Sequence, residues 1–180
     1  GEVVPVTFKT RKGDVTVDTD EQPGKGRPDK IPQLRAAFAK DGTITAATSS
    51  SISDGAAAVV LTRESVAKEN GQTPVAKVIA MAAHAREPKD FTVAPVGAIQ
   101  KVLDNAGWSV DDVELWEVNE AFACVAMFAM RDIGIRHEKV NVNGGATALG
   151  HPIGASGARI LVTLINALKH QGKTKGVASL

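Results

Sequence analysis

The stretch Asn143-Gly-Gly-Ala-Thr-Ala-Leu-Gly-His-Pro-Ile-Gly-Ala-Ser-Gly157 decides the fold that we expect of this chain. It holds five glycines and one proline around a single histidine, His151. Residues 139–143 before it are expected to form a short strand, and the apolar residues after it recur at the spacing of a helix that Gly172 can end. Such a strand, glycine-rich turn and helix bring backbone N–H groups close to a small or anionic ligand. The stretch therefore predicts a ligand site between a strand and a helix.

His151 is the residue of this stretch that can carry chemistry. Imidazole titrates near neutral pH and can take a proton from a thiol or from a carbon atom. Glycine-rich turns are common, however, and a histidine inside one can also cap or pack the turn. The local pattern leaves both interpretations open.

Strands and helices alternate along the rest of the chain. We expect strands at residues 3–8, 15–17, 54–61, 75–82, 113–118 and 175–180. We expect helices from Pro32 to Phe38, at 63–70, from Pro95 to Gly107, at 120–131 and after His151. The helix at 120–131 is apolar nearly all round, which is typical of a central, buried helix. The alternation predicts a layered α/β domain at residues 52–180 with helices covering a sheet, preceded by a smaller lobe at residues 1–51.

Composition narrows the class of protein. The chain has 180 residues, a formal net charge of +1 and a single cysteine, Cys124. A nearly neutral chain gives no general reason to expect nucleic acid or membrane as a partner. One cysteine excludes an internal disulfide framework and a cysteine-rich metal site, and we expect no bound metal. Without a long apolar run or a signal-peptide pattern, we expect a cytoplasmic protein. Both ends lie inside expected strands, which favours a segment of a longer protein.

Asn119 marks a second candidate position, where the strand at 113–118 gives way to the helix at 120–131. Its ordinary role there is an N-cap, with the side chain accepting a hydrogen bond from the helix backbone. Junctions at the carboxyl ends of strands are also where open α/β sheets bind ligands. His151 follows the end of the next strand, so both side chains could face one pocket.

Two segments resemble signature sequences of one enzyme family. Asn119-Glu-Ala-Phe-Ala123 and Gly144-Gly-Ala-Thr-Ala-Leu-Gly-His-Pro-Ile-Gly-Ala-Ser-Gly-Ala-Arg159 closely resemble those of the thiolases, the acetyl-CoA C-acyltransferases. Gly42-Thr-Ile-Thr-Ala46 and Ser53-Asp-Gly-Ala-Ala-Ala58 are similar to thiolase sequence as well. The resemblance covers essentially the whole chain. It implies the layered thiolase-type α/β fold, a mixed sheet covered by helices, with the end of the coenzyme-A loop domain at 1–51 and the C-terminal core domain at 52–180.

The resemblance also implies roles for individual residues. His151 matches the histidine that activates the nucleophilic cysteine and helps to hold the thioester oxygen. Asn119 matches the asparagine that positions a water in the same oxyanion hole. Phenylalanines in α/β domains more often fill the core, so the tunnel role of the aromatic residues has a plain alternative. The residues expected to contact the pantetheine arm of coenzyme A or to line its tunnel are Ser50, Phe38, Phe91 and Phe122.

The implied reaction is the reversible Claisen condensation and thiolysis of 3-ketoacyl-CoA in fatty acid metabolism, with coenzyme A as substrate and no permanently bound cofactor. Thiolases use two catalytic cysteines, one in the N-terminal half and one directly after a strand similar to Gly176–Leu180. Cys124 matches neither, so we expect these residues alone to be inactive. The expected partners are the N-terminal half of the enzyme and further copies, in a homodimer or homotetramer.

Two alternatives stay open. A β-ketoacyl synthase shares the fold and a glycine-flanked histidine, but it would carry a second catalytic histidine or a different asparagine motif in place of Asn119-Glu-Ala-Phe122. The other alternative is a non-catalytic thiolase-like half that acts as a lipid-carrier or interaction module.

Overall fold

Two short parallel strands form the centre of the structure, β3 (Leu115–Val118) and β4 (Gly176–Ser179). The structure is a computed structural model and describes residues 3–180 of the chain. The register places Leu115 opposite Gly176. Every residue of β3 is buried, as expected of a parallel strand that is covered on both faces.

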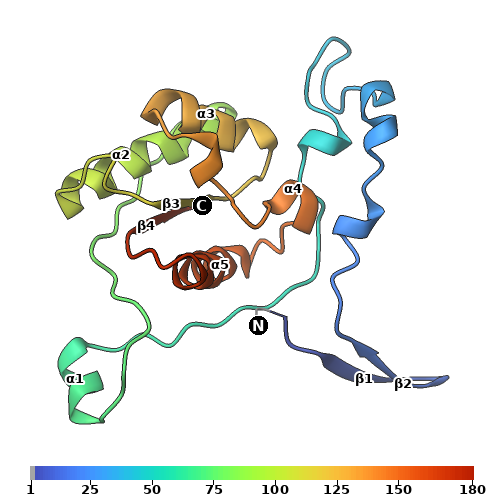
Figure 1. Cartoon of the computed structure of the whole chain (residues 1–180). Helices are drawn as coiled ribbons and strands as arrows, with labels where there is room; N and C mark the ends of the chain where they lie inside the picture. The colour runs from blue at the N-terminus through green and yellow to red at the C-terminus, as the bar shows by residue number, and fades with distance from the viewer. Residues whose placement is uncertain (1–2) are drawn as a thin grey trace.

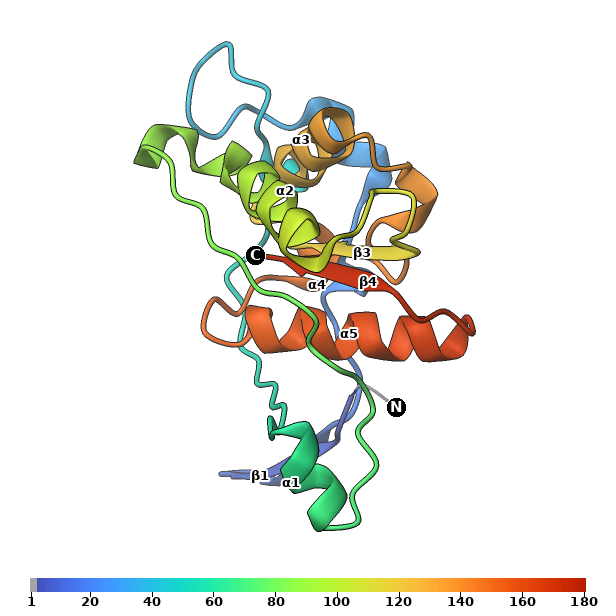
Figure 2. The ribbon, with the colours of Figure 1, turned by 90° about the vertical axis from the view of Figure 1, so that its left-hand side faces the viewer.

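Helices cover both faces of this strand pair, as Figure 2 shows. α5 (Ser156–His170) packs on one face, and α2 (Ala94–Ala106) and α3 (Ala123–Ile133) pack together on the other. α2 ends at Gly107, whose left-handed φ of 67° suits a residue without a side chain. The predicted layered α/β class is confirmed, as are the helices expected at 95–107 and after His151.

The core lies in two layers, one on each face of β3. Trp116 and Val118 point to the side of α2 and α3, whereas Leu115 packs with Leu164 of α5. This division follows from the strand itself, because successive side chains point to opposite faces. Burying one large apolar side chain contributes about 1.5–3 kcal/mol. The layers therefore fix where the carboxyl end of β3 lies.

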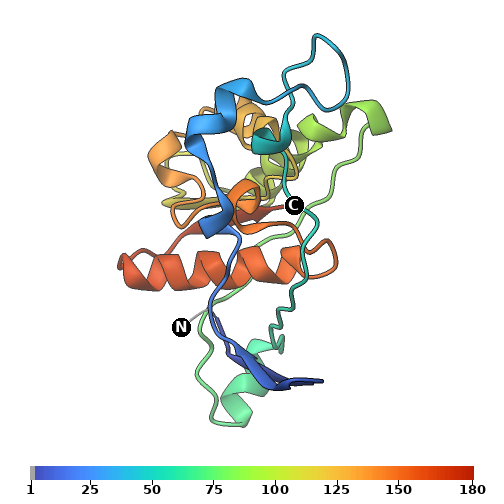
Figure 3. The same cartoon turned by 90° about the vertical axis from the view of Figure 1, so that its right-hand side faces the viewer.

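The remaining elements surround this centre. The hairpin β1 (Val6–Thr10) and β2 (Gly13–Val17) and the helix α1 (Glu64–Glu69) confirm predicted elements and lie beyond α5, away from the sheet (Figures 1 and 3). Within residues 3–180, no helix has both the length and the apolar composition needed to cross a bilayer. The other helical segments are α4 (Ala146–Leu149) and the 3-10 helices η1 (Pro23–Lys25), η2 (Pro28–Gln33), η3 (Ala46–Thr48), η4 (Pro88–Val93) and η5 (His137–Lys139).

Two predicted strands are absent. Residues 54–61 and 75–82 run as extended connections around the central unit (Figure 1), without strand pairing. They are also exposed rather than buried, with 95% of Val60 and 86% of Val75 accessible. Their β-branched residues favour extended backbone, but a strand also needs a neighbouring backbone to pair with, and nothing within residues 3–180 supplies one.

The strand predicted at 139–143 is also wrong. Lys139 lies in η5, and only Val140 forms an isolated parallel bridge, with Trp116. Asn141 then adopts a left-handed φ of 47°, which turns the chain away from β3. Asparagine tolerates this conformation better than most residues, so the strand ends after a single bridge.

Two helix predictions need correction. Pro32 lies inside η2 and opens no helix, and the chain is already extended at Leu34. The helix predicted at 120–131 begins only at Ala123, because the backbone leaving β3 is still extended at Phe122. It is also not buried all round, since 60% of Met127 is exposed.

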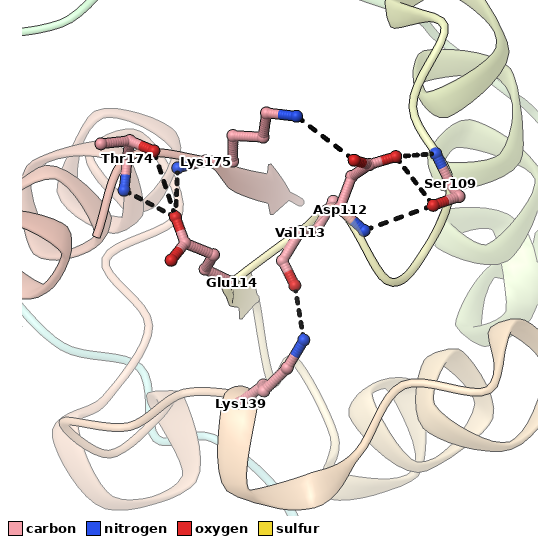
Figure 4. A network of polar contacts seen from close by, with 7 residues as sticks. All are labelled: Ser109, Asp112, Val113, Glu114, Lys139, Thr174 and Lys175. Carbon is pink, nitrogen blue, oxygen red and sulfur yellow. Dashed lines mark hydrogen bonds and ion pairs between the residues drawn. The ribbon is translucent and has the colours of Figure 1, made fainter.

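A polar network ties together the loops that lead into β3 and β4 (Figure 4). Glu114 accepts hydrogen bonds from the backbone N–H groups of Thr174 (2.7 Å) and Lys175 (3.1 Å). Asp112 accepts from the Ser109 N–H (2.9 Å) and hydroxyl (2.7 Å), and its other oxygen lies 3.3 Å from Lys175 Nζ. These carboxylates hold the starts of the two strands in register.

We expect the substitution Ser109→Ala to raise the pKa of Asp112. Hydrogen bonds from Ser109, followed by the bond and charge of Lys175, lower this pKa from 3.8 to about 2. Because the folded-state value lies below the unfolded-state value, the Asp112 carboxylate stabilises the fold above about pH 4, and this contribution is lost as the pH falls toward 2. NMR titration of the side chain measures the shift. A pKa near 3.8 in the unsubstituted protein would contradict this account.

Candidate functional site

Asn119 and His151 meet beyond the carboxyl end of β3. Asn119 Nδ2 lies 3.4 Å from His151 Nε2, and Asn119 is 5% exposed. The two side chains therefore face each other, and the pocket that we expect them to share stays a prediction. The N-cap alternative for Asn119 is wrong, because α3 begins at Ala123 and its N-cap position is Phe122.

Two hydrogen bonds hold His151 in place. Its backbone N–H donates to the carbonyl of Ser51 (2.9 Å), and its Nδ1 lies 2.6 Å from the hydroxyl of Ser156, which is fully buried. The Ser156 hydroxyl in turn donates to the carbonyl of Pro152 (3.1 Å). A hydroxyl has a single proton, so in this arrangement it accepts from Nδ1–H. The proton of neutral His151 then lies on Nδ1, and Nε2 keeps a lone pair that faces Asn119.

The surroundings of His151 favour its neutral form. Partial burial lowers the pKa of His151 below its ordinary value of 6.5, and the positive charge of Arg159 lowers it further. Both effects favour the neutral imidazole of His151 at neutral pH. A neutral imidazole with a free Nε2 lone pair can act as a general base toward a thiol.

We expect Ser156→Ala to weaken the preference of neutral His151 for the Nδ1–H tautomer. Without the hydroxyl, only the long 3.4 Å contact from Asn119 Nδ2 to Nε2 favours the Nδ1–H form, so the preference for this tautomer weakens. Long-range ¹H–¹⁵N NMR of the imidazole distinguishes the two forms, and it should show Nδ1–H in the unsubstituted protein and a mixture in the variant. Ser53→Ala is the matched control, because it removes a hydroxyl that contacts Ser51 and not the ring. An unchanged tautomer in Ser156→Ala would contradict the assignment.

The other predicted site residues lie around the segment that follows Asn119. The N–H and the hydroxyl of Ser50 both donate to the carbonyl of Ala121, at 3.1 and 3.0 Å. The ring of Phe122 lies 5.8 Å from that of Phe38 and 6.0 Å from that of Phe91, between centroids. We call Phe38, Phe91 and Phe122 the phenylalanine cluster.

The phenylalanine cluster is not part of the closed core. Phe38 is 74% exposed and Phe91 is 46% exposed, whereas Phe122 packs against the core on the side of α3. Phe38 and Phe91 are therefore accessible within residues 3–180, and their role in lining a tunnel stays a prediction. An exposed group of aromatic rings beside a polar site is suited to contact a ligand with an apolar arm.

Sequence reasoning missed two residues that shape the site. Ser156 was inside the quoted glycine-rich stretch, and the one turn that leads from His151 into α5 brings its hydroxyl back to the imidazole. Glu120 directly follows Asn119, and its carboxylate bonds to two residues of the loop that carries His151. Within residues 3–180 no group of three His, Cys, Asp or Glu side chains is placed to hold a metal ion. Cys124, half-buried in α3, is the only free thiol in this range.

Comparison with protein families identifies the class. Residues 72–180 match the model described as "Thiolase, C-terminal domain", and residues 1–65 match "Thiolase, N-terminal domain". The chain belongs to the thiolase family. The boundary that we predict near Ser51 stays a prediction.

Individual relatives narrow the comparison to named enzymes. The acetyl-CoA acetyltransferase of Yarrowia lipolytica is 52% identical over 168 residues, and that of Syntrophomonas wolfei is 47% identical over 181 residues. These matches cover 93% and 99% of this chain but only 42% and 46% of the relatives. The chain thus spans about half the length of the curated relatives it matches.

The solved structures that this chain resembles are also acetyl-CoA acetyltransferases and thiolases, and the chain again covers less than half of each. The acetyl-CoA acetyltransferase of Bacillus anthracis matches with a TM-score of 0.93 and 42% identity, over 97% of this chain and 45% of that one. Human mitochondrial 3-ketoacyl-CoA thiolase matches with a TM-score of 0.83 and 34% identity, over 98% of this chain and 45% of that one. The Acat5 thiolase of Ascaris suum, solved in complex with coenzyme A, has a TM-score of 0.83 and 40% identity, over 97% of this chain and 44% of that one.

Proposed function

We propose that the protein containing these residues catalyses the reversible thiolysis of 3-ketoacyl-CoA by coenzyme A, with acetoacetyl-CoA as the simplest substrate. The observation that carries the proposal is the contact between Asn119 Nδ2 and His151 Nε2. Both side chains come from segments that resemble thiolase signatures, and the named relatives include acetyl-CoA acetyltransferases.

His151 begins the proposed reaction. Its Nε2 takes the proton of a cysteine thiol that the rest of the protein supplies, and the thiolate adds to the ketone carbonyl of the substrate. The carbon–carbon bond next to that carbonyl then breaks, which leaves an acyl-cysteine thioester and the enolate of acetyl-CoA. The enolate takes a proton to give acetyl-CoA, and coenzyme A displaces the cysteine from the acyl group.

The oxyanion on the thioester carbonyl is the group that the site must stabilise. Once protonated, His151 Nε2–H can donate to this oxygen, and Asn119 beside it holds the water that supplies a further donor. At 3.4 Å the resting contact between the two side chains is long for a hydrogen bond, so a substrate oxygen displaces it at little cost. The Nδ1 bond to Ser156 keeps the ring in place throughout.

Coenzyme A binds, in this proposal, along Ser50 and the phenylalanine cluster. The support is that Ser50 bonds to Ala121 and that Phe122 follows it, both within the short segment after Asn119. An apolar arm bound along these residues would run close to Asn119. We further propose that the rest of the enzyme covers the exposed apolar residues at 54–61 and 75–82. Assembly into a homo-oligomer, a cytoplasmic location and a part in fatty acid metabolism complete the proposal for the longer protein.

A hybrid enzyme tests the proposal. In it, residues 1–180 replace the matching segment of the Bacillus anthracis acetyl-CoA acetyltransferase, whose remaining residues supply the rest of the fold. We expect the hybrid enzyme to cleave acetoacetyl-CoA in the presence of coenzyme A, and the isolated chain to be inactive. A folded hybrid enzyme without thiolysis activity would favour the non-catalytic alternative.

A further inference from the structure

Glu120 links the two segments that carry Asn119 and His151. Its Oε1 accepts a hydrogen bond from Asn141 Nδ2 (2.8 Å). Its Oε2 accepts from both the backbone N–H (3.1 Å) and the hydroxyl (2.6 Å) of Thr147. The carboxylate therefore spans from the end of β3 to α4, which directly precedes His151.

Asn141 extends this link to β3 itself. Its Oδ1 accepts from the backbone N–H of Val118 (2.8 Å), and its Nδ2 donates to the carbonyl of the same residue (2.9 Å). These two bonds replace the backbone pairing that the chain gives up where Asn141 turns away with its left-handed φ. Because Oδ1 faces a donor, the amide orientation is determined, and both protons of Nδ2 are used by Val118 and Glu120.

Gly145 shows how closely the Glu120 carboxylate fits its surroundings. A Cβ added at this position would collide with all three atoms of the carboxylate. Only a glycine lets the backbone before α4 approach Glu120, and that approach brings the Thr147 N–H within reach. The turn and the carboxylate thus fit each other, independently of the hydrogen bonds to Asn141.

We propose that Glu120 is a positioning residue that sets the separation of Asn119 and His151. It acts through Asn141 and Thr147, with three donors converging on one acceptor-only group. The role rests on the proposed function, because a fixed Asn119–His151 geometry matters only if both groups serve one reacting centre. Displacement of a catalytic group by about 1 Å can cost about 10²-fold in rate.

Glu120→Gln tests the proposal in the hybrid enzyme. The glutamine amide has the same shape, but whichever way it points, its NH₂ group faces a donor, either Asn141 Nδ2 or the Thr147 pair. We expect kcat for thiolysis to fall about 10–100-fold while KM for coenzyme A changes less than about 3-fold, because the coenzyme contacts lie on other residues. A crystal structure of the variant should show Asn119 Nδ2 and His151 Nε2 further apart than 3.4 Å.

Glu114→Gln is the matched control. Glu114 also accepts from the N–H (2.7 Å) and hydroxyl (3.2 Å) of one threonine, Thr174, but in the loops before β3 and β4. It should leave kcat unchanged, whatever it does to stability. An unchanged kcat or an unchanged Asn119–His151 distance in Glu120→Gln would overturn the proposal, as would an equal loss of kcat in Glu114→Gln. An inactive unsubstituted hybrid enzyme would instead reject the proposed function, and the crystallographic distance would still test the positioning role.

Discussion

Replacing His151 with alanine in the hybrid enzyme is expected to lower kcat for thiolysis of acetoacetyl-CoA by at least about 10³-fold. General-base catalysis contributes about 10²–10⁴-fold, and loss of one oxyanion donor costs about 10²–10³-fold. His151 serves both purposes in the proposed reaction, because the Nε2 atom that takes the thiol proton then donates to the oxyanion. Steady-state kinetics at saturating coenzyme A measures the loss.

The control for this prediction is His170→Ala. His170 lies at the exposed end of α5, and its loss should leave kcat within about 2-fold of the unsubstituted hybrid enzyme. The pH profile gives a second check. Burial and Arg159 lower the pKa of His151, so activity should hold at pH 7 and fall only as the pH drops below the ordinary histidine value of 6.5. If kcat of His151→Ala stayed within about 10-fold of the unsubstituted hybrid enzyme, His151 would have no part in the mechanism.

Asn119→Ala is expected to lower kcat by about 10²–10³-fold. Asn119 Nδ2 lies beside the nitrogen that faces the reacting thioester, and its loss removes both this donor and the water that we assign to it. The effect should appear in kcat more than in KM, because the oxyanion exists only along the reaction path. Stopped-flow measurement of acetoacetyl-CoA cleavage separates the chemical step from product release.

Asn166→Ala is the matched control for Asn119→Ala. Asn166 also carries an amide side chain and is half-buried, but its Nδ2 donates to the carbonyl of Val162 within α5 (2.9 Å). Its removal should cost some stability and little activity. If the two variants were equally active, Asn119 would have a structural role and the proposed oxyanion site would be wrong.

The elements that could be predicted from sequence are those that pack against or pair with another element of the same chain. α2 and α5 show helical spacing of apolar residues, and both have a sheet face to cover. β3 and β4 are short strands that pair with each other, so their backbone N–H and carbonyl groups find hydrogen-bond partners within the chain. The approach of Asn119 to His151 was expected from the ends of two neighbouring strands. Only the first of these strands, β3, is present, and Val140 contributes a single bridge to Trp116 before the chain turns at Asn141.

The strand predictions at residues 54–61 and 75–82 failed because a strand needs a neighbouring backbone as well as a suitable sequence. Residues 54–61 and 75–82 have strand-like sequence, but no backbone within residues 3–180 pairs with them. Ser156 and Glu120 were missed for a related reason. The Ser156 bond depends on the single turn from His151 into α5. The Glu120 bonds depend on the left-handed backbone of Asn141, which no local propensity indicates strongly.

The most direct test of the central claim is a crystal structure of the hybrid enzyme with acetoacetyl-CoA bound. We predict that the thioester oxygen lies about 3 Å from His151 Nε2, next to the amide of Asn119, with the pantetheine arm along Ser50 and the phenylalanine cluster. A thioester oxygen that lies away from both His151 and Asn119 in a folded, substrate-bound hybrid enzyme would contradict the claim that these two side chains form one oxyanion site.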